Sequence, residues 1–121
     1  PPTGGKEVTG MFGSFWNPEE EGDSLEGVLV GTTPIENAKR EKIDRFILLD
    51  GDGKVWTLPD HVDLSGKLRR IKELSRVFIE YLGREPVQTR GRGEVSMLRY
   101  GVADYGPVEG GEALADAALR R

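Results

Sequence analysis

Alternation of apolar and polar residues predicts five β-strands along the chain. In each segment, β-branched, aromatic or leucine side chains recur at every second position or form a short apolar run, which is the pattern of a strand. Glycine, proline and aspartate bound these segments and favour turns. The predicted strands are residues 24–32, 43–50, 54–58, 76–83 and 94–105.

The hydrophobic period changes once, within residues 59–74. Leu64, Leu68 and Ile71 recur there at the spacing of one helix face, so a short helix is predicted. The segment "GDGK" at 51–54 predicts a tight turn, because Asp-Gly pairs adopt positive φ easily. Residues 43–58 are therefore expected to form a hairpin that precedes the helix.

The predicted order of elements is β-β-β-α-β-β, with the helix between strands 3 and 4. This is the order of the OB-fold, a five-stranded Greek-key barrel, so the predicted fold class is mainly β. Gly27 and Gly31 lie inside the first strand, where glycine permits the bending or close backbone approach that a small closed barrel needs. OB-fold ligands lie across strands 2 and 3, between the loops that join strands 1–2 and 4–5. Here those loops are expected at 33–42 and 84–93.

The chain divides into three predicted parts. Residues 1–10 are rich in proline and glycine and predict a flexible N-terminal arm, 11–105 form the barrel domain, and 106–121 form a C-terminal tail that ends in a short helix. An aromatic cluster at 11–16 precedes an acidic turn. This cluster is expected either to pack on the edge of the domain or to contact a protein partner.

Composition supports one globular domain of 121 residues. The chain has no cysteine, which excludes disulfides and thiolate metal sites. No apolar run approaches the roughly 18 residues that a membrane span requires. A cytoplasmic location without membrane contact is therefore expected, which would be the host cytoplasm for a viral protein. The sequence does not predict the oligomeric state.

Charge is distributed unevenly in a chain whose net charge is −4. Residues 39–100 carry 14 lysines and arginines against 10 acidic residues, whereas residues 1–38 and 101–121 are acidic. A basic middle on an acidic protein is compatible with a polyanion site and also with charges scattered over a solvated surface.

The two predicted loops are the most basic in the chain, so their cations are candidates for binding phosphates. Nearby aromatic rings are candidates for stacking on bases. For Trp56 and Tyr81 a role in the core is the alternative, and Tyr100 is expected in the core. The candidate nucleic-acid-binding residues are Lys39, Arg40, Lys42, Arg45, Lys54, Trp56, Tyr81, Arg84, Arg90 and Arg92.

Three segments resemble a family of small OB-fold proteins of bacteriophages and related elements. They are "FWNPEEEGDSLEGVLVG", "KLRRIKELSRVFIEYLGREP" and "GRGEVSMLRYGV". Members of this family bind single-stranded DNA. The resemblance spans residues 15–105 and implies single-stranded DNA binding, in a setting such as phage DNA replication. The chain departs from many such proteins at its end, which is Arg120-Arg121 rather than an acidic tail.

The function expected is binding of single-stranded nucleic acid, DNA before RNA, largely independent of sequence. The alternative is a structural or protein-interaction barrel, such as a viral assembly or regulatory protein, whose N-terminal aromatic and acidic segment contacts partners. Enzyme activity, a metal and a cofactor are not expected, because the chain lacks a phosphate-binding loop and a dinucleotide fingerprint and has one histidine, His61. Asp63 or Asp60 beside it is expected to cap the start of the helix.

Overall fold

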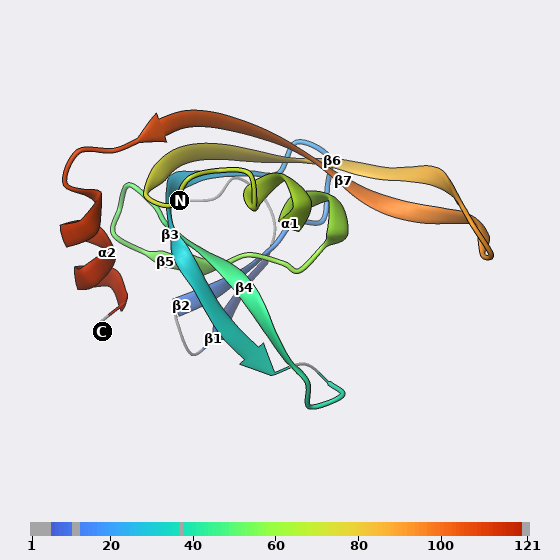
Figure 1. Cartoon of the computed structure of the whole chain (residues 1–121), viewed down its shortest axis with the longest axis horizontal. Coiled ribbons are helices and arrows are strands. Elements are labelled where there is room, and N and C mark those ends of the chain that lie inside the picture. The colour runs from blue at the N-terminus through green and yellow to red at the C-terminus, as the bar shows by residue number, and fades with distance from the viewer. Residues whose placement is uncertain (1–5, 11–12, 37, 120–121) are drawn as a thin grey trace.

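The computed structural model of the protein describes residues 6–10, 13–36 and 38–119. A curled sheet of seven strands forms most of this part of the chain (Figure 1). All neighbouring strands are antiparallel except β2 and β5, which are parallel. The strands, in the order in which they lie side by side, are β1 (Lys6–Gly10), β2 (Gly13–Asn17), β5 (Val55–Thr57), β4 (Lys42–Leu49), β3 (Ser24–Glu36), β6 (Ser75–Thr89) and β7 (Gly93–Pro107). The helices are α1 (Val62–Leu68) and α2 (Gly111–Leu119).

The predicted mainly β class is confirmed, but the predicted number of five strands is wrong for the described residues. The five predicted strands correspond to β3 through β7, and α1 lies between β5 and β6 as expected. The additional strands, β1 and β2, come from the N-terminal segment. The loose arm expected over 1–10 thus contains a strand at Lys6–Gly10, while 1–5 and the first two residues of the aromatic cluster lie outside the described part.

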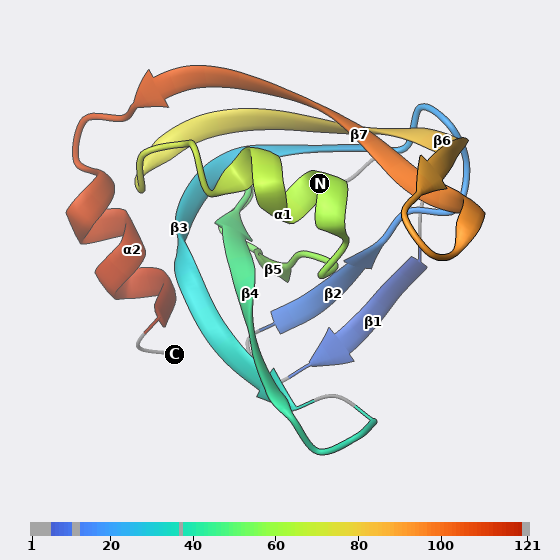
Figure 2. The same cartoon turned by 45° about the vertical axis from the view of Figure 1, so that its right-hand side comes forward.

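Figure 2 shows α1 inside the curl of the sheet. The larger core includes Leu64 and Leu68 of this helix and side chains of the surrounding strands. Leu64 and Leu68 point from α1 into this core and are 0% and 1% exposed, which confirms the predicted helix face. Trp16 from β2 and Tyr100 from β7 meet there with ring centroids 6.2 Å apart. Tyr100 is buried, as expected, and the aromatic cluster supplies Trp16 to the core.

The helix is shorter than the segment 59–74 in which it was predicted. It ends at Leu68, and the chain continues in two turns, in which Arg70 N donates to Lys67 O and Ile71 N donates to Leu68 O. The predicted cap is also wrong. His61 occupies the N-cap position without a side-chain hydrogen bond to the helix backbone.

A second, smaller apolar cluster lies on the opposite face of the sheet. Ile47, Leu49, Val30 and Val55 form it, and Ala115 of α2 packs against it. Figure 1 shows α2 beside β3, at the left of the molecule. The two clusters explain why both faces of the predicted strand 43–50 are apolar. Leu48 belongs to the larger core, whereas Ile47 and Leu49 on either side of it belong to the smaller cluster.

The glycines of β3 have the roles expected of them. A Cβ atom on Gly27 would collide with the carbonyl oxygen of Leu49 and with Cδ2 of Leu48 on β4. Gly31 has φ +142° and lies at a shift in the β3–β4 register. The first residue therefore permits close approach of two strands, and the second permits an irregular bend.

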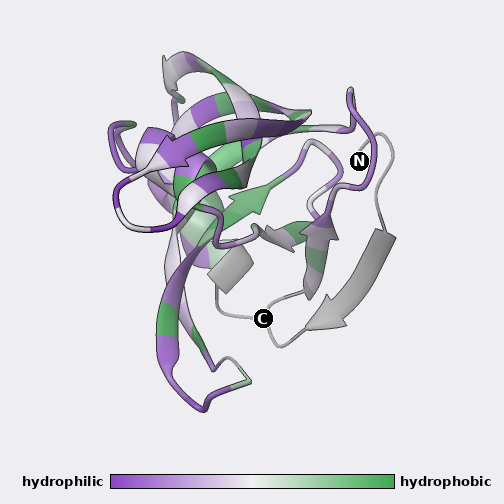
Figure 3. Cartoon of the chain, turned by 90° about the vertical axis from the view of Figure 1, so that its right-hand side faces the viewer, coloured by the Kyte–Doolittle hydropathy of each residue, from purple (hydrophilic) through white to green (hydrophobic). Residues whose placement is uncertain are grey.

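Two β-hairpins, β3–β4 and β6–β7, extend away from the rest of the sheet as arms (Figure 1). Their connections are shorter than the predicted loops 33–42 and 84–93, because β3 continues to Glu36 and β6 continues to Thr89. The β3–β4 arm is mostly hydrophilic toward its tip (Figure 3).

Neither described helix combines the length and the apolar composition that a membrane crossing requires.

Candidate functional site

The β6–β7 arm begins at a bulge formed by Tyr81 and Gly83. Gly83 has φ +89°, and a Cβ atom at this position would lie 2.6 Å from Oε1 of Glu21. Beyond the bulge the strands remain paired to Thr89 and Gly93, where Thr89 Oγ1 donates a hydrogen bond of 3.0 Å to Gly93 O. The arm is therefore a regular ribbon with a short turn at residues 90–92.

Three predicted arginines lie on this arm and are exposed to solvent. Arg84 is opposite Leu98 in the strand register, and Arg90 and Arg92 are in the turn. None of the three guanidinium groups forms an ion pair or hydrogen bond with a described residue. By contrast, Arg99 Nε lies 3.4 Å from a carboxylate oxygen of Glu85. The arm thus presents three cations to solvent, as the sequence predicted.

A cavity of about 350 Å³ opens along the arm. The side chains around it are of two kinds, because Arg84 and Arg92 are cationic whereas Val62, Met97 and Leu98 are apolar. Val62 comes from the first position of α1 and is 79% exposed. The cavity therefore combines positive charge with an apolar wall.

The β3–β4 arm brings Lys39, Arg40 and Lys42 together at its tip, all exposed. Lys42 is opposite Glu36 in the register. Arg40 has φ 60°, in the region where few residues other than glycine are found. Acidic residues on this arm offset much of its positive charge, so it is the less basic of the two arms.

Arg45 and Lys54 do not lie on an open binding face as predicted. Arg45 is half-buried: its Nε donates a hydrogen bond of 2.8 Å to Leu58 O, and its guanidinium carbon lies 5.2 Å from the Phe15 ring centroid. Burial lowers the pKa of Arg45, against a raising effect of Asp60. Lys54 Nζ lies 4.4 Å from the centroid of a Trp56 ring. Both cations pack within the fold.

The structure places Trp56 and Tyr81 in the core, so neither ring is available for stacking on a base. Trp56 is 1% exposed, and its Nε1 donates a hydrogen bond of 2.9 Å to Asp50 Oδ2. Tyr81 is 6% exposed, with its ring centroid 5.3 Å from that of Tyr100. The core alternative is therefore correct for both residues, and Asp50 supplies the polar partner of the buried Trp56 indole.

Asp50 also organises the predicted turn at 51–54. Its Oδ1 accepts hydrogen bonds of 2.9 Å from the backbone N–H groups of Asp52 and Lys54. Burial acts to raise the pKa of Asp50, but these bonds and that from Trp56 outweigh it and lower the pKa. The charged carboxylate therefore has a structural role.

A polar network joins the start of α1 to β7 beside the cavity. Asp63 Oδ2 accepts from the Tyr100 backbone N–H at 2.8 Å and from Lys67 Nζ at 3.1 Å. Lys67 Nζ also donates to Tyr100 O at 2.5 Å. His61 Nδ1 lies 2.6 Å from the Tyr100 hydroxyl. Asp63, one of the two candidates for the helix cap, thus accepts a hydrogen bond from the neighbouring strand β7 instead.

Burial lowers the pKa of His61, and the positive charges of Arg45 and Arg84 lower it further. Asp60 acts in the opposite direction. The imidazole is therefore held in its neutral form more strongly than in a solvated histidine.

Sequence reasoning missed Val62 and Met97 at the cavity. The one signal for Val62 in the sequence is that an apolar residue stands at the otherwise polar start of a helix.

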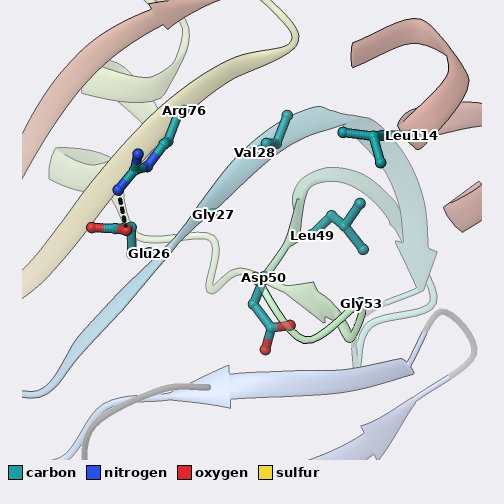
Figure 4. A pocket seen from close by; sticks show the side chains of 9 residues that line it. Glu26, Gly27, Val28, Leu49, Asp50, Gly53, Arg76 and Leu114 are labelled. Carbon is teal, nitrogen blue, oxygen red and sulfur yellow. Dashed lines mark hydrogen bonds and ion pairs between the residues drawn. The ribbon is translucent and has the colours of Figure 1, made fainter. Parts of the chain in front are cut away.

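Figure 4 shows a second cavity, of about 460 Å³, which involves β3, the β4–β5 turn and Leu114 of α2. Arg76 and Glu26 line it and pair with each other at 2.7 Å. Asp50, also in its wall, is engaged by Trp56. In this cavity the charge of Arg76 is balanced by Glu26, whereas the cavity on the β6–β7 arm is lined, among the described residues, by two arginines and no acidic residue.

Among the described residues, no group of three or more histidine, cysteine, aspartate or glutamate side chains is placed to hold a metal ion. Comparison of the chain with protein-family models, curated proteins and solved structures gave no significant match.

Proposed function

We propose that this protein binds single-stranded nucleic acid with little dependence on sequence. DNA is the first candidate ligand and RNA the second. The observation that carries the proposal is the β6–β7 arm, on which Arg84, Arg90 and Arg92 are exposed without a carboxylate partner among the described residues. Guanidinium groups bind phosphate through paired hydrogen bonds and also stack on bases. The β3–β4 arm contributes Lys39, Arg40 and Lys42 as a second contact.

The strand order supports an OB-fold as the framework of this site. Strands β5, β4, β3, β6 and β7 lie side by side in the order 3-2-1-4-5 of that fold, with the helix between strands 3 and 4. The β1–β2 ribbon, paired to β5, is an addition to it. The two arms correspond to the connections 1–2 and 4–5 that grip OB-fold ligands. The family resemblance to phage proteins stays a prediction.

The proposed contact set is narrower than the sequence suggested. Arg45 and Lys54 pack within the fold, and the rings of Trp56 and Tyr81 are buried, so cations on the arms supply most of the interaction. Phosphate contacts release counterions, which makes such binding steeply dependent on salt. The affinity is therefore expected to fall strongly as salt rises.

The proposal predicts that replacing Arg84, Arg90 and Arg92 together by alanine weakens binding and flattens its salt dependence. Each phosphate contact contributes about 0.7 to the slope of log affinity against log salt for a single strand. Loss of three contacts should lower that slope by about 2. Fluorescence anisotropy of a labelled strand of about 20 nucleotides, measured at several salt concentrations, tests this.

The matched control is replacement of Arg69, Arg70 and Lys72 by alanine. These residues are exposed at and beyond the end of α1, and their loss changes the net charge by the same amount. The proposal is wrong if both triple variants weaken binding equally, or if the protein prefers duplex. Absence of binding at low salt favours the alternative of a protein-interaction barrel, for which the exposed Tyr105 is a candidate contact.

A further inference from the structure

We infer that the cavity on the β6–β7 arm holds one unstacked nucleobase, gripped by aliphatic and thioether side chains in place of an aromatic ring. This inference rests on the proposed function and specifies which part of the single-stranded nucleic acid the same site binds. It assigns the arginines to the phosphates and the apolar wall to the base.

Val62 and Met97 are not part of the core, although Leu98 of the same wall also packs against it. Leu64 and Leu68 carry the packing of α1 and are 0% and 1% exposed, whereas Val62 on the same helix is 79% exposed. A single exposed apolar side chain is ordinary. Here, however, Val62 lies at the same cavity as the half-buried Met97 and Leu98, which belong to a different element. Together they line a partly apolar surface of this cavity, in which Leu98 also packs against the core and Met97 Sδ lies 3.7 Å from Arg99 Nη1.

The charges around this surface favour a nucleotide over an uncharged apolar ligand. Arg84 stands at the base of the arm, opposite Leu98, and Arg92 lies in the turn, one position beyond the last register pair, Thr89–Gly93. Arg92 is therefore six positions from Leu98, which is about 20 Å along the ribbon at about 3.3 Å per residue. An anionic backbone that follows the arm can therefore meet one cation on each side of the cavity.

The chemistry of the wall suits a flat aromatic heterocycle. The thioether of Met97 is polarizable and makes favourable contacts with aromatic rings. Ser96 also lines the cavity, and its hydroxyl both donates and accepts hydrogen bonds, so it can meet the edge of any base. A base reaches such a cavity only when it is unpaired and unstacked. The cavity thereby selects single strands over duplex.

The test compares two strands of equal length and equal phosphate number, oligothymidine and an oligomer of abasic deoxyribose phosphate. The protein is expected to bind the abasic strand about tenfold more weakly, near the lower end of the loss for a base stacked on an aromatic ring. In Met97→Ala combined with Val62→Ser, the affinity for oligothymidine should fall to nearly that for the abasic strand. The salt slope should stay unchanged, because no phosphate contact is lost. Anisotropy titrations measure both quantities.

The matched control is Leu82→Ala, which removes an apolar side chain that is 48% exposed outside this cavity. It should leave both affinities unchanged. Equal affinities of the wild type for the two strands, with a steep salt slope, would overturn this inference and leave the proposed function intact. A Leu82→Ala variant as weak as the double variant would also overturn it. Binding of neither strand would overturn the proposed function itself.

Discussion

His61 is the one described side chain whose ordinary pKa lies near neutrality, and its surroundings favour its neutral form. Burial is the main cause, followed by the charges of Arg45 and Arg84, while Asp60 acts against them. Its Nδ1 shares a short hydrogen bond with the hydroxyl of the buried Tyr100. Protonation of His61 therefore costs more in the folded chain than in the unfolded chain.

This difference predicts a pH dependence of stability. A folded pKa below the unfolded value of about 6.5 adds stability above that value, and the stability is lost as pH falls through the folded pKa. The free energy of unfolding should therefore decrease between about pH 7 and pH 5, and His61→Asn should remove most of this decrease. Urea denaturation of both proteins across this range measures it. Parallel pH profiles would contradict the prediction.

At the scale of elements, β7 is an edge strand whose centre is covered by α1. Tyr100 N donates to Asp63, and Tyr100 O accepts from Lys67. The side chains of a short helix thus satisfy main-chain groups that an edge strand would otherwise present to another chain. Covering an edge in this way protects against unwanted strand pairing.

Asp63→Ala is predicted to destabilise the protein by about 1–3 kcal/mol, the typical cost of leaving a part-buried donor without its partner. The same change at Asp44, an exposed residue of β4, should have little effect. Equilibrium denaturation of the two variants gives the comparison. A loss at Asp44 as large as that at Asp63 would argue against the role assigned to the edge contact.

Elements were predictable where one face of a segment is buried. Leu64 and Leu68 revealed α1, and Gly27 revealed a close approach of strands. The ends of β3 and β6 were missed because a two-stranded arm is largely exposed on both faces and shows no clear apolar alternation. The burial of Trp56 was not decidable either, since both sides of its partner strand β4 are apolar.

At the scale of the whole molecule, the sheet is packed on both faces. The larger core forms against α1, and Ala115 of α2 packs against the smaller cluster. The candidate site needs long-range pairing that no local pattern reveals. Val62 of α1 and Met97 of β7 are 35 positions apart and meet only because β7 returns past the helix. This is why the cations were found from the sequence and the cavity was not.

The long β6–β7 ribbon has a consequence for motion. Beyond Gly83 its strands have solvent on both faces and few buried side chains, and such segments open at a lower free energy than core strands. Amide hydrogens of residues 84–98 should therefore exchange with solvent faster than those of residues 77–81, as mass spectrometry can measure. Uniform exchange along β6 would contradict this. A bound strand would slow the opening, so part of the binding free energy is used to order the arm.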